Sequence, residues 1–304
     1  MKKLFTILIA TILSFSAFAE VSIYNELGTN TVRINKDKTQ VGTFYNETDV
    51  TFSHEKITAR VDAMAWFDPD PDVNDLSVLF VEWYTTLHAL PNLDLSMNNK
   101  YRSNNSKFTI RWEDVSFARI GPEGVSATLL FDKLKVNLGV PFQNYSEKNT
   151  FSLSAGTAYD FENFQVSTVI EKKRDDFALG AWFASKWVNV GYGHNHETLG
   201  LTGGNIVALS SYPVFGGFEP GVEFATNFKG DFYFGVQANY RINNFLIRTN
   251  AWGNYVNDLL TYQVEGGLSY FFKDHHEICA KLRLNITDKT VDTISVPVYW
   301  AYFY

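Results

Sequence analysis

Apolar and polar residues alternate along most of the chain. In the clearest segments every second residue is apolar and the residues between are polar or charged, as for Ile57, Ala59 and Val61 beside Thr58 and Arg60. Successive side chains of a strand point to opposite faces, so this period of two predicts strands with one apolar and one wet face. The clearest such segments are residues 57–65, 151–155, 164–170, 177–183, 232–240, 245–251, 260–270 and 278–284.

Links rich in polar residues separate these strands. Residues 160–163, 241–244 and 272–274 are short enough for tight turns between antiparallel neighbours. The links that alternate with them lie at residues 141–149, 171–175, 195–202, 253–258 and 286–292. No second domain or low-complexity block interrupts the pattern. We therefore expect an all-β chain with one continuous antiparallel sheet of about 16 strands, within a range of roughly 14 to 18.

Two segments leave the strand count open. Residues 125–140 form either one strand with a β-bulge beside Asp132 or two unusually short strands. Residues 75–88 are either a strand or a helix in a long loop, which could fold into the lumen if the sheet closes into a barrel. Leu76, Leu79, Phe80, Trp83 and Leu87 have helical spacing, whereas Val78, Val81, Thr85 and Thr86 are β-branched. The β-branched residues favour the strand.

Both ends of the chain carry a distinct apolar pattern. Val298, Trp300, Tyr302 and Tyr304 form a continuous stripe on one face of the last strand. Such a stripe would invite aggregation in water, whereas in a bilayer it faces lipid. At the other end, Lys2 and Lys3 precede the apolar residues 4–12, and a small-x-small site follows at 17–19. This arrangement predicts a signal peptide over residues 1–19; a membrane anchor needs about 20 apolar residues.

Composition narrows the function classes. The chain has 16 Tyr, 7 Trp and 26 Phe, which suits the aromatic girdles of a membrane barrel as well as an aromatic-rich exported sandwich. The formal charge of −7 becomes −9 once Lys2 and Lys3 are removed, since −7 − 2 = −9. An acidic chain without a dense basic run is a poor nucleic-acid binder. The single Cys279 cannot close an intramolecular disulfide.

The terminal aromatic stripe, together with the predicted signal peptide and the repeated alternation, resembles the pattern of Gram-negative outer-membrane β-barrels of the porin kind. This resemblance implies a single transmembrane antiparallel β-barrel over residues 20–304 and passive passage of small hydrophilic solutes, without a cofactor. It also implies an outer-membrane location in contact with lipid and lipopolysaccharide, folding by the outer-membrane assembly machinery, and often a homotrimer. Val298, Trp300, Tyr302 and Tyr304 would form the assembly signal, in which Tyr304 replaces the usual terminal Phe.

Charged residues on the wet face of the strands are the candidates for lining a pore. An enclosure of about 16 strands is too wide for side chains to fill, so charges on its inner wall would set which solutes pass. Basic candidates slightly outnumber acidic ones, which predicts a weak anion preference; internal ion pairing that only stiffens the barrel is an equal alternative. The candidates are Arg60, Asp62, Arg111, Glu113, Lys135, Glu223, Arg248, Glu265, Lys281 and Arg283.

Other constellations carry weaker signals. Asp68, Asp70 and Asp72 could hold Ca²⁺, but their spacing lacks the Gly and Glu of an EF-hand loop. His194 and His196 would share one face of a strand and could bind zinc with further ligands. A solvated loop and an aqueous histidine pair are the favoured interpretations, so we expect no metal.

Two other functions belong to the same fold class. An omptin-like outer-membrane protease would pair Asp68 and Asp70 with Asp274 and His276. The predicted topology places these two pairs on opposite sides of the membrane, so we expect no enzyme. A surface adhesin or receptor barrel would need long loops, and most links are short.

Overall fold

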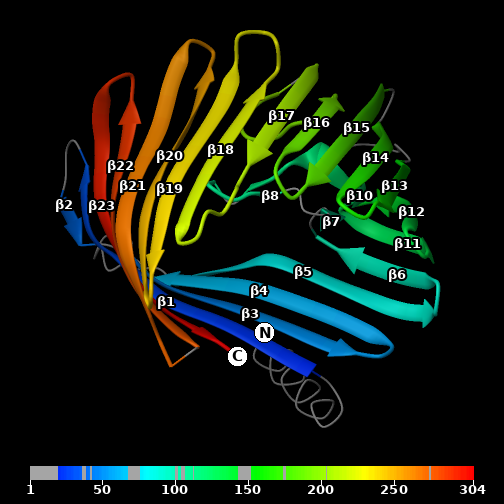
Figure 1. Cartoon of the computed structure of the whole chain (residues 1–304), viewed down its shortest axis with the longest axis horizontal. Helices are drawn as coiled ribbons and strands as arrows, with labels where there is room; N and C mark the ends of the chain where they lie inside the picture. Colours follow the sequence, from blue (N-terminus) through cyan, green and yellow to red (C-terminus); the bar gives the residue numbers. More distant parts are fainter. Residues whose placement is uncertain are drawn as a thin grey trace.

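The computed structural model describes residues 20–35, 39–41, 43–67, 76–99, 102–103, 107–111, 113–142, 152–173, 176–202, 204–273 and 275–304. These residues form a closed antiparallel β-barrel, because β23 pairs with β1 and every other wall strand pairs with its two neighbours (Figure 1). Within this described part the sheet has nineteen strands, of which eighteen close the barrel and β2 is a short addition beside β1. The expected all-β barrel is therefore confirmed, and eighteen strands lie inside the expected range.

The first part of the wall consists of long strands followed by shorter ones. These strands are β1 (Glu20–Asn35), β2 (Thr39–Val41), β3 (Phe44–His54), β4 (Ile57–Phe67), β5 (Leu76–Leu90), β6 (Leu93–Asn98), β11 (Gly124–Phe131), β12 (Leu134–Pro141), β13 (Ser154–Asp160) and β14 (Phe164–Lys173).

The rest of the wall leads back to β1. Its strands are β15 (Asp176–Ser185), β16 (Asn189–His194), β17 (Asn205–Ser211), β18 (Phe218–Thr226), β19 (Phe232–Ile242), β20 (Phe245–Val256), β21 (Leu259–Phe272), β22 (His276–Thr287) and β23 (Thr290–Phe303).

Both segments that the sequence left open are strands. Residues 76–90 form β5, so the strand prediction is confirmed and the helical alternative is wrong. Residues 125–140 do not form one bulged strand, because Asp132 takes a positive φ of 46° and Phe131 pairs directly with Leu134 across a tight turn. The described residues contain no helix that is long and apolar enough to cross a membrane.

Tight turns fix the register of the last strands. Asn257 and Asp258 both have positive φ, and so do Asp288 and Lys289. Positive φ at both central residues is the backbone of the turn that suits the twist of a two-residue hairpin. These turns lie at one end of the barrel, whereas β1 begins and β23 finishes at the other. We call these the loop end and the terminal end.

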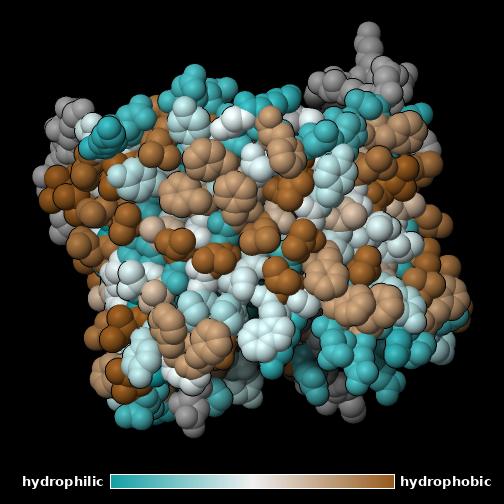
Figure 2. Space-filling view, turned by 45° about the horizontal axis from the view of Figure 1, so that its top comes forward, coloured by the Kyte–Doolittle hydropathy of each residue, from teal (hydrophilic) through white to brown (hydrophobic). Residues whose placement is uncertain are grey.

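The barrel is apolar on the outside. Large apolar side chains at every second position are exposed, as for Ile278 and Leu282 on β22, while Glu277 and Cys279 on either side of Ile278 are buried. Figure 2 shows this surface as an apolar band between hydrophilic edges. In water such a band would be an aggregation site, and its extent around the wall matches the lipid-facing belt of membrane barrels.

A segment between β6 and β11, which we call the inner loop, lies inside the barrel (Figure 1). Its described parts are residues 99, 102–103, 107–111 and 113–123. It contains β7 (Arg102–Ser103), β8 (Lys107–Phe108), β9 (Glu113–Asp114), the 3₁₀ helix η2 (Ser116–Ala118) and β10 (Arg119–Gly121). None of these pairs with a wall strand; β7 pairs with β10, and β8 with β9.

Candidate solute pathway

The inner loop covers one side of the barrel interior. Phe108 and Phe117 have no exposed surface and pack with Trp182, Leu199 and Tyr233 in one apolar cluster. Trp182 and Tyr233 are inward residues of β15 and β19, so this cluster joins the loop to the wall. The hydrophobic core of the molecule therefore sits between loop and wall, on one side of the interior.

Inward glycines let the loop approach the wall closely. A Cβ at Gly156 on β13 would lie 2.2 Å from the carbonyl oxygen of Ile120, and one at Gly180 on β15 would lie 2.5 Å from that of Phe117. Backbone oxygens cannot rotate away as a flexible side chain can. These strands can carry the loop only because both positions lack a Cβ.

Buried polar contacts fix the loop further. The Arg119 guanidinium forms an ion pair with Glu171 of β14, and both side chains are buried. The Ser116 hydroxyl lies 3.3 Å from Nδ1 of His196. Glu223 of β18 accepts a hydrogen bond from the backbone N–H of Ile110 at 2.8 Å. A buried polar group that loses its partner costs about 1–3 kcal/mol, so each contact opposes displacement of the loop.

The other side of the interior is polar. We define the polar wall as the inward face of β20–β23, β1 and β3–β6. One charged group on it surrounds Arg60 of β4, with Nη2 2.7 Å from Asp49 Oδ2 and Nη1 3.2 Å from Glu82 Oε1. All three side chains keep about a fifth of their surface exposed. Glu26 of β1 accepts hydrogen bonds from the hydroxyls of Tyr24 and Tyr45 beside this group.

A second charged group lies on β20, β21 and β22. Glu265 is 2.9 Å from Nζ of Lys281 and 2.8 Å from Nη2 of Arg283. Arg248 is 2.8 Å from Glu277 and donates to the Ser269 hydroxyl at 3.0 Å. Cations and carboxylates thus alternate along the polar wall. Ion pairs between them outweigh any excess of positive or negative side chains.

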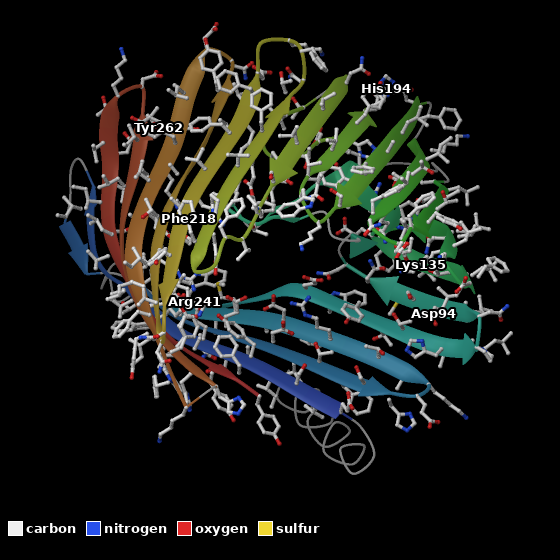
Figure 3. The ribbon with its side chains drawn as sticks, viewed as in Figure 1. Asp94, Lys135, His194, Phe218, Arg241 and Tyr262 are labelled. Carbon is white, nitrogen blue, oxygen red and sulfur yellow. The ribbon has the colours of Figure 1, made fainter. Side chains whose placement is uncertain are left out.

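The structure places the sequence candidates in two different settings. Arg60, Asp62, Lys135, Arg248, Glu265, Lys281 and Arg283 are inward on wall strands. Figure 3 shows Lys135 of β12 and Arg241 of β19 on opposite walls. Lys135 pairs with Asp160 at 3.5 Å, and Arg241 with Glu219 at 3.6 Å.

Three candidates differ from the sequence expectation. Arg111 and Glu113 are not on wall strands; they belong to the inner loop, and the side chain of Glu113 lies outside the described part. Glu223 is inward on β18 but only 3% exposed, because the loop covers it. Sequence reasoning missed the loop, although the apolar residues of segment 108–120 lack a sustained alternation and Pro122 interrupts the strand pattern.

The two residues of the histidine pair lie in different surroundings. His194, at the loop end in Figure 3, lies 2.8 Å from the Asn205 side chain, whereas His196 is buried against Ser116 and Phe117 inside the barrel. The positive φ of Asn195 turns the chain between them, so the expectation that both share a strand face is wrong. The aspartates 68, 70 and 72 lie outside the described residues, which elsewhere hold no metal-ligating group of three.

Aromatic rings form girdles near both edges of the apolar band. At the terminal end Phe161 contacts the tilted ring of Tyr159 and stacks on Phe164, with ring centroids 4.5 Å and 4.3 Å apart. His276 belongs to the same girdle and stacks on Trp300 at 5.7 Å. Phe224, Phe232 and Tyr255 form a matching group at the loop end. His276 therefore faces outward. Asp274, which would act with His276 in an omptin-like protease, lies outside the described residues.

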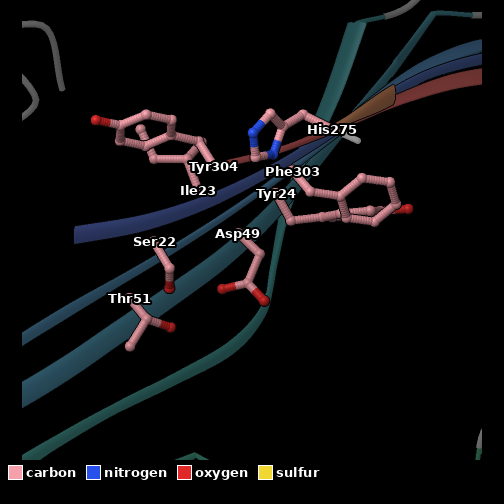
Figure 4. A pocket seen from close by; sticks show the side chains of 8 residues that line it. All are labelled: Ser22, Ile23, Tyr24, Asp49, Thr51, His275, Phe303 and Tyr304. Atoms are coloured by element: carbon pink, nitrogen blue, oxygen red, sulfur yellow. The ribbon is translucent and has the colours of Figure 1, made fainter. Parts of the chain in front are cut away.

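The proposed assembly residues share the outward face of β23. Trp300 is 38% exposed and the residues on either side of it face inward, which puts Val298 and Tyr302 on the lipid side. Tyr304 closes the seam, since its backbone N–H donates to Ile23 and its carbonyl accepts from Ile23. A pocket of about 290 Å³ lies beside this seam (Figure 4). Its lining residues are Ser22, Ile23, Tyr24, Asp49, Thr51, His275, Phe303 and Tyr304.

Comparison with solved structures decides the fold class. OccAB3 of Acinetobacter baumannii superposes with a TM-score of 0.63 at 8% identity, over 95% of this chain and 99% of that one. This chain has the fold of an outer-membrane porin. OpdK of Pseudomonas aeruginosa, solved with vanillate, matches with a TM-score of 0.61 at 11% identity, over 94% and 98% of the chains.

OccK2 (OpdF) of Pseudomonas aeruginosa, in complex with glucuronate, gives a TM-score of 0.59 at 9% identity, over 94% and 97% of the chains. No family model and no curated protein matches the sequence. At these identities the likeness establishes the porin-like fold and carries no residue roles.

Proposed function

We propose that this chain is a passive diffusion channel for small hydrophilic solutes in the outer membrane of a Gram-negative bacterium. The observation that carries the proposal is the pairing of an apolar exterior with a charged polar wall inside. Arg60, Glu82 and Arg283 keep 20–32% of their side-chain surface exposed although they point inward. Exposed charges inside a closed barrel require water, and a wet interior that crosses the lipid is a route for solutes.

The inner loop would narrow this route without closing it. It packs against β12–β19 and reaches Trp252 of β20, while the charged groups around Arg60 and Glu265 lie on the rest of the polar wall. Solutes would therefore pass between loop and polar wall. At this narrow part of the route the solute would pass between the loop, which rests on an apolar cluster, and a charged wall. Such a passage favours small polar solutes over large or apolar ones.

The predicted weak anion preference stays a prediction. Arg60, Lys135, Arg248, Lys281 and Arg283 each have a carboxylate partner within 4 Å. Such pairing supports the alternative interpretation, in which charges brace the wall and the pathway discriminates weakly. Vanillate and glucuronate, named with two of the similar structures, are both carboxylates and make suitable first probes of the preference.

The signal peptide, the lipid and lipopolysaccharide contacts, the assembly machinery and the homotrimer belong to the same proposal. The outward apolar band and the aromatic girdles support the lipid contact, the terminal stripe supports the assembly machinery, and the pattern of residues 1–19 supports the signal peptide. An adhesin or receptor barrel would share all of these features, so only transport separates the two functions.

Liposome swelling tests the proposed function. The purified protein, reconstituted into liposomes, should admit arabinose faster than raffinose, because passage through a narrow wet route falls with solute size. Swelling equal to that of empty liposomes, for protein that shows the heat-dependent gel migration of a folded barrel, would reject the channel and leave the adhesin. The same assay with glucuronate and with an uncharged sugar of similar size measures the anion preference.

A further inference from the structure

Glu223 is buried inside the barrel with three hydrogen-bond donors. Its Oε1 accepts from the Ile110 N–H at 2.8 Å and from the Tyr212 hydroxyl, and its Oε2 accepts from the Tyr233 hydroxyl at 2.5 Å. A carboxylate removed from water is costly unless its oxygens are hydrogen-bonded. The three donors provide these hydrogen bonds to the Glu223 carboxylate and connect it to three separate parts of the chain.

These donors come from the inner loop, the link after β17 and β19. Tyr212 in that link also accepts the Thr109 N–H at 3.1 Å, so two consecutive backbone N–H groups of the loop are held. Burial, together with the neighbouring Glu223 carboxylate, raises the pKa of Tyr212, which therefore stays protonated and keeps donating. We call Glu223, Tyr212 and Tyr233 the clamp.

The residue that follows the clamped backbone is Arg111. Its guanidinium lies over the ring of Trp252 at 5.1 Å and near that of Tyr233 at 5.9 Å, both within cation–π range. Trp252 is inward on β20, four residues beyond Arg248 of the polar wall. Arg111 therefore lies where the inner loop meets the polar wall, and the residue is partly exposed, although its Nη1 is buried.

We propose that Glu223 is a positioning residue that, through the clamp, holds the Arg111 guanidinium at the edge of the solute pathway and thereby sets the ion preference. The proposal rests on the channel function above. Tyr233 joins the two parts, since its hydroxyl binds Glu223 while its ring contacts Arg111. A carboxylate that sequence alone assigns to the pore lining thus acts from behind the loop.

Reversal potentials across planar bilayers under a KCl gradient test the proposal. A unit positive charge about 6 Å from an ion in water raises the local anion concentration about threefold and lowers the local cation concentration about threefold, so Arg111→Gln should lower the anion-to-cation permeability ratio by about ninefold. Glu223→Ala should move the ratio toward the Arg111→Gln value. Glu223→Gln, whose amide oxygen still accepts the Ile110 N–H, should stay near the parent.

The double variant separates positioning from direct electrostatics. Combined with Arg111→Gln, Glu223→Ala should add no further change, because the group it positions is gone. Glu219→Ala is the matched control: Glu219 is inward on the same strand but pairs with Arg241, so its effect should be additive with Arg111→Gln. An additive effect of Glu223→Ala, or none on the parent, would overturn the clamp.

Two further measurements distinguish failure of the clamp from failure of a variant to fold and from failure of the channel function. If Glu223→Ala does not fold, Tyr212→Phe replaces it; the loss of the hydroxyl should shift the ratio in the same direction, and an unchanged ratio would reject the proposal. Absence of conductance in the parent protein would instead defeat the channel function itself, which is a different result from a conducting barrel with unaltered preference.

Discussion

Replacing Gly156 by Ala tests whether the inner loop lies on the wall as described. The new Cβ would lie 2.2 Å from the Ile120 carbonyl oxygen and 2.9 Å from the Ile120 Cα. Ordinary van der Waals contact begins near 3.4 Å, so the loop must move by about 3.4 − 2.2 = 1.2 Å. Overpacking of this kind costs roughly 1–3 kcal/mol of folding free energy.

The direction of the movement has a functional consequence. Because β13 lies behind Ile120, the loop can move only away from the wall, into the space that solutes would use. We therefore expect Gly156→Ala to lower both the free energy of unfolding and the single-channel conductance. Urea unfolding in lipid vesicles, followed by tryptophan fluorescence, measures the first quantity, and planar bilayers measure the second.

Gly266→Ala is the matched control on β21. A Cβ at Gly266 would have one neighbour, the Arg248 carbonyl oxygen at 4.0 Å, so stability and conductance should match the parent. Equal behaviour of the two variants would refute the close approach of loop and wall. A loss confined to Gly156→Ala would support it.

Three other substitutions examine the exterior, the polar wall and the seam. Leu282→Arg, at the middle of β22, should cost about 2–4 kcal/mol of unfolding free energy in vesicles, against about 0–1 kcal/mol for Val291→Arg at the loop end; equal costs would contradict the lipid-facing assignment. Glu265→Gln leaves two cations without their shared carboxylate and should raise the anion-to-cation permeability ratio; an unchanged reversal potential would show that this pair lies off the pathway. Deleting Tyr304 removes both seam hydrogen bonds to Ile23 and should reduce the folded, heat-modifiable fraction in outer membranes; parental levels would contradict the terminal-signal argument.

The barrel could be predicted from the sequence because its physics is local and repetitive. Each strand, such as residues 278–284 in β22, shows its two faces through alternation alone, and tight turns such as 243–244 are short and polar. The inward positions of Arg60, Arg248 and Arg283 follow from the same alternation. Residues 75–88 were ambiguous because apolar residues lie on both faces, and β-branching resolved them correctly as strand.

The inner loop could not be predicted in this way. Its position depends on contacts between residues far apart in sequence, such as Phe117 against Gly180 and Ile110 against Glu223. An inward Glu on a strand gives no sign of what covers it, so alternation alone cannot distinguish Glu223, which the loop covers, from Glu265, which lies against Lys281 and Arg283. The prediction that His194 and His196 share a face was wrong for a related reason. Asn195 between them has a positive φ, which reverses the direction in which the His196 side chain points.

Single-channel recording in planar bilayers tests the central claim most directly. The claim is that a charged, wet route runs between the inner loop and the polar wall of a barrel whose exterior contacts lipid. Purified, folded protein should produce stepwise conductance increments that scale with salt concentration. Folded protein that inserts into the bilayer and leaves it electrically silent would contradict the claim.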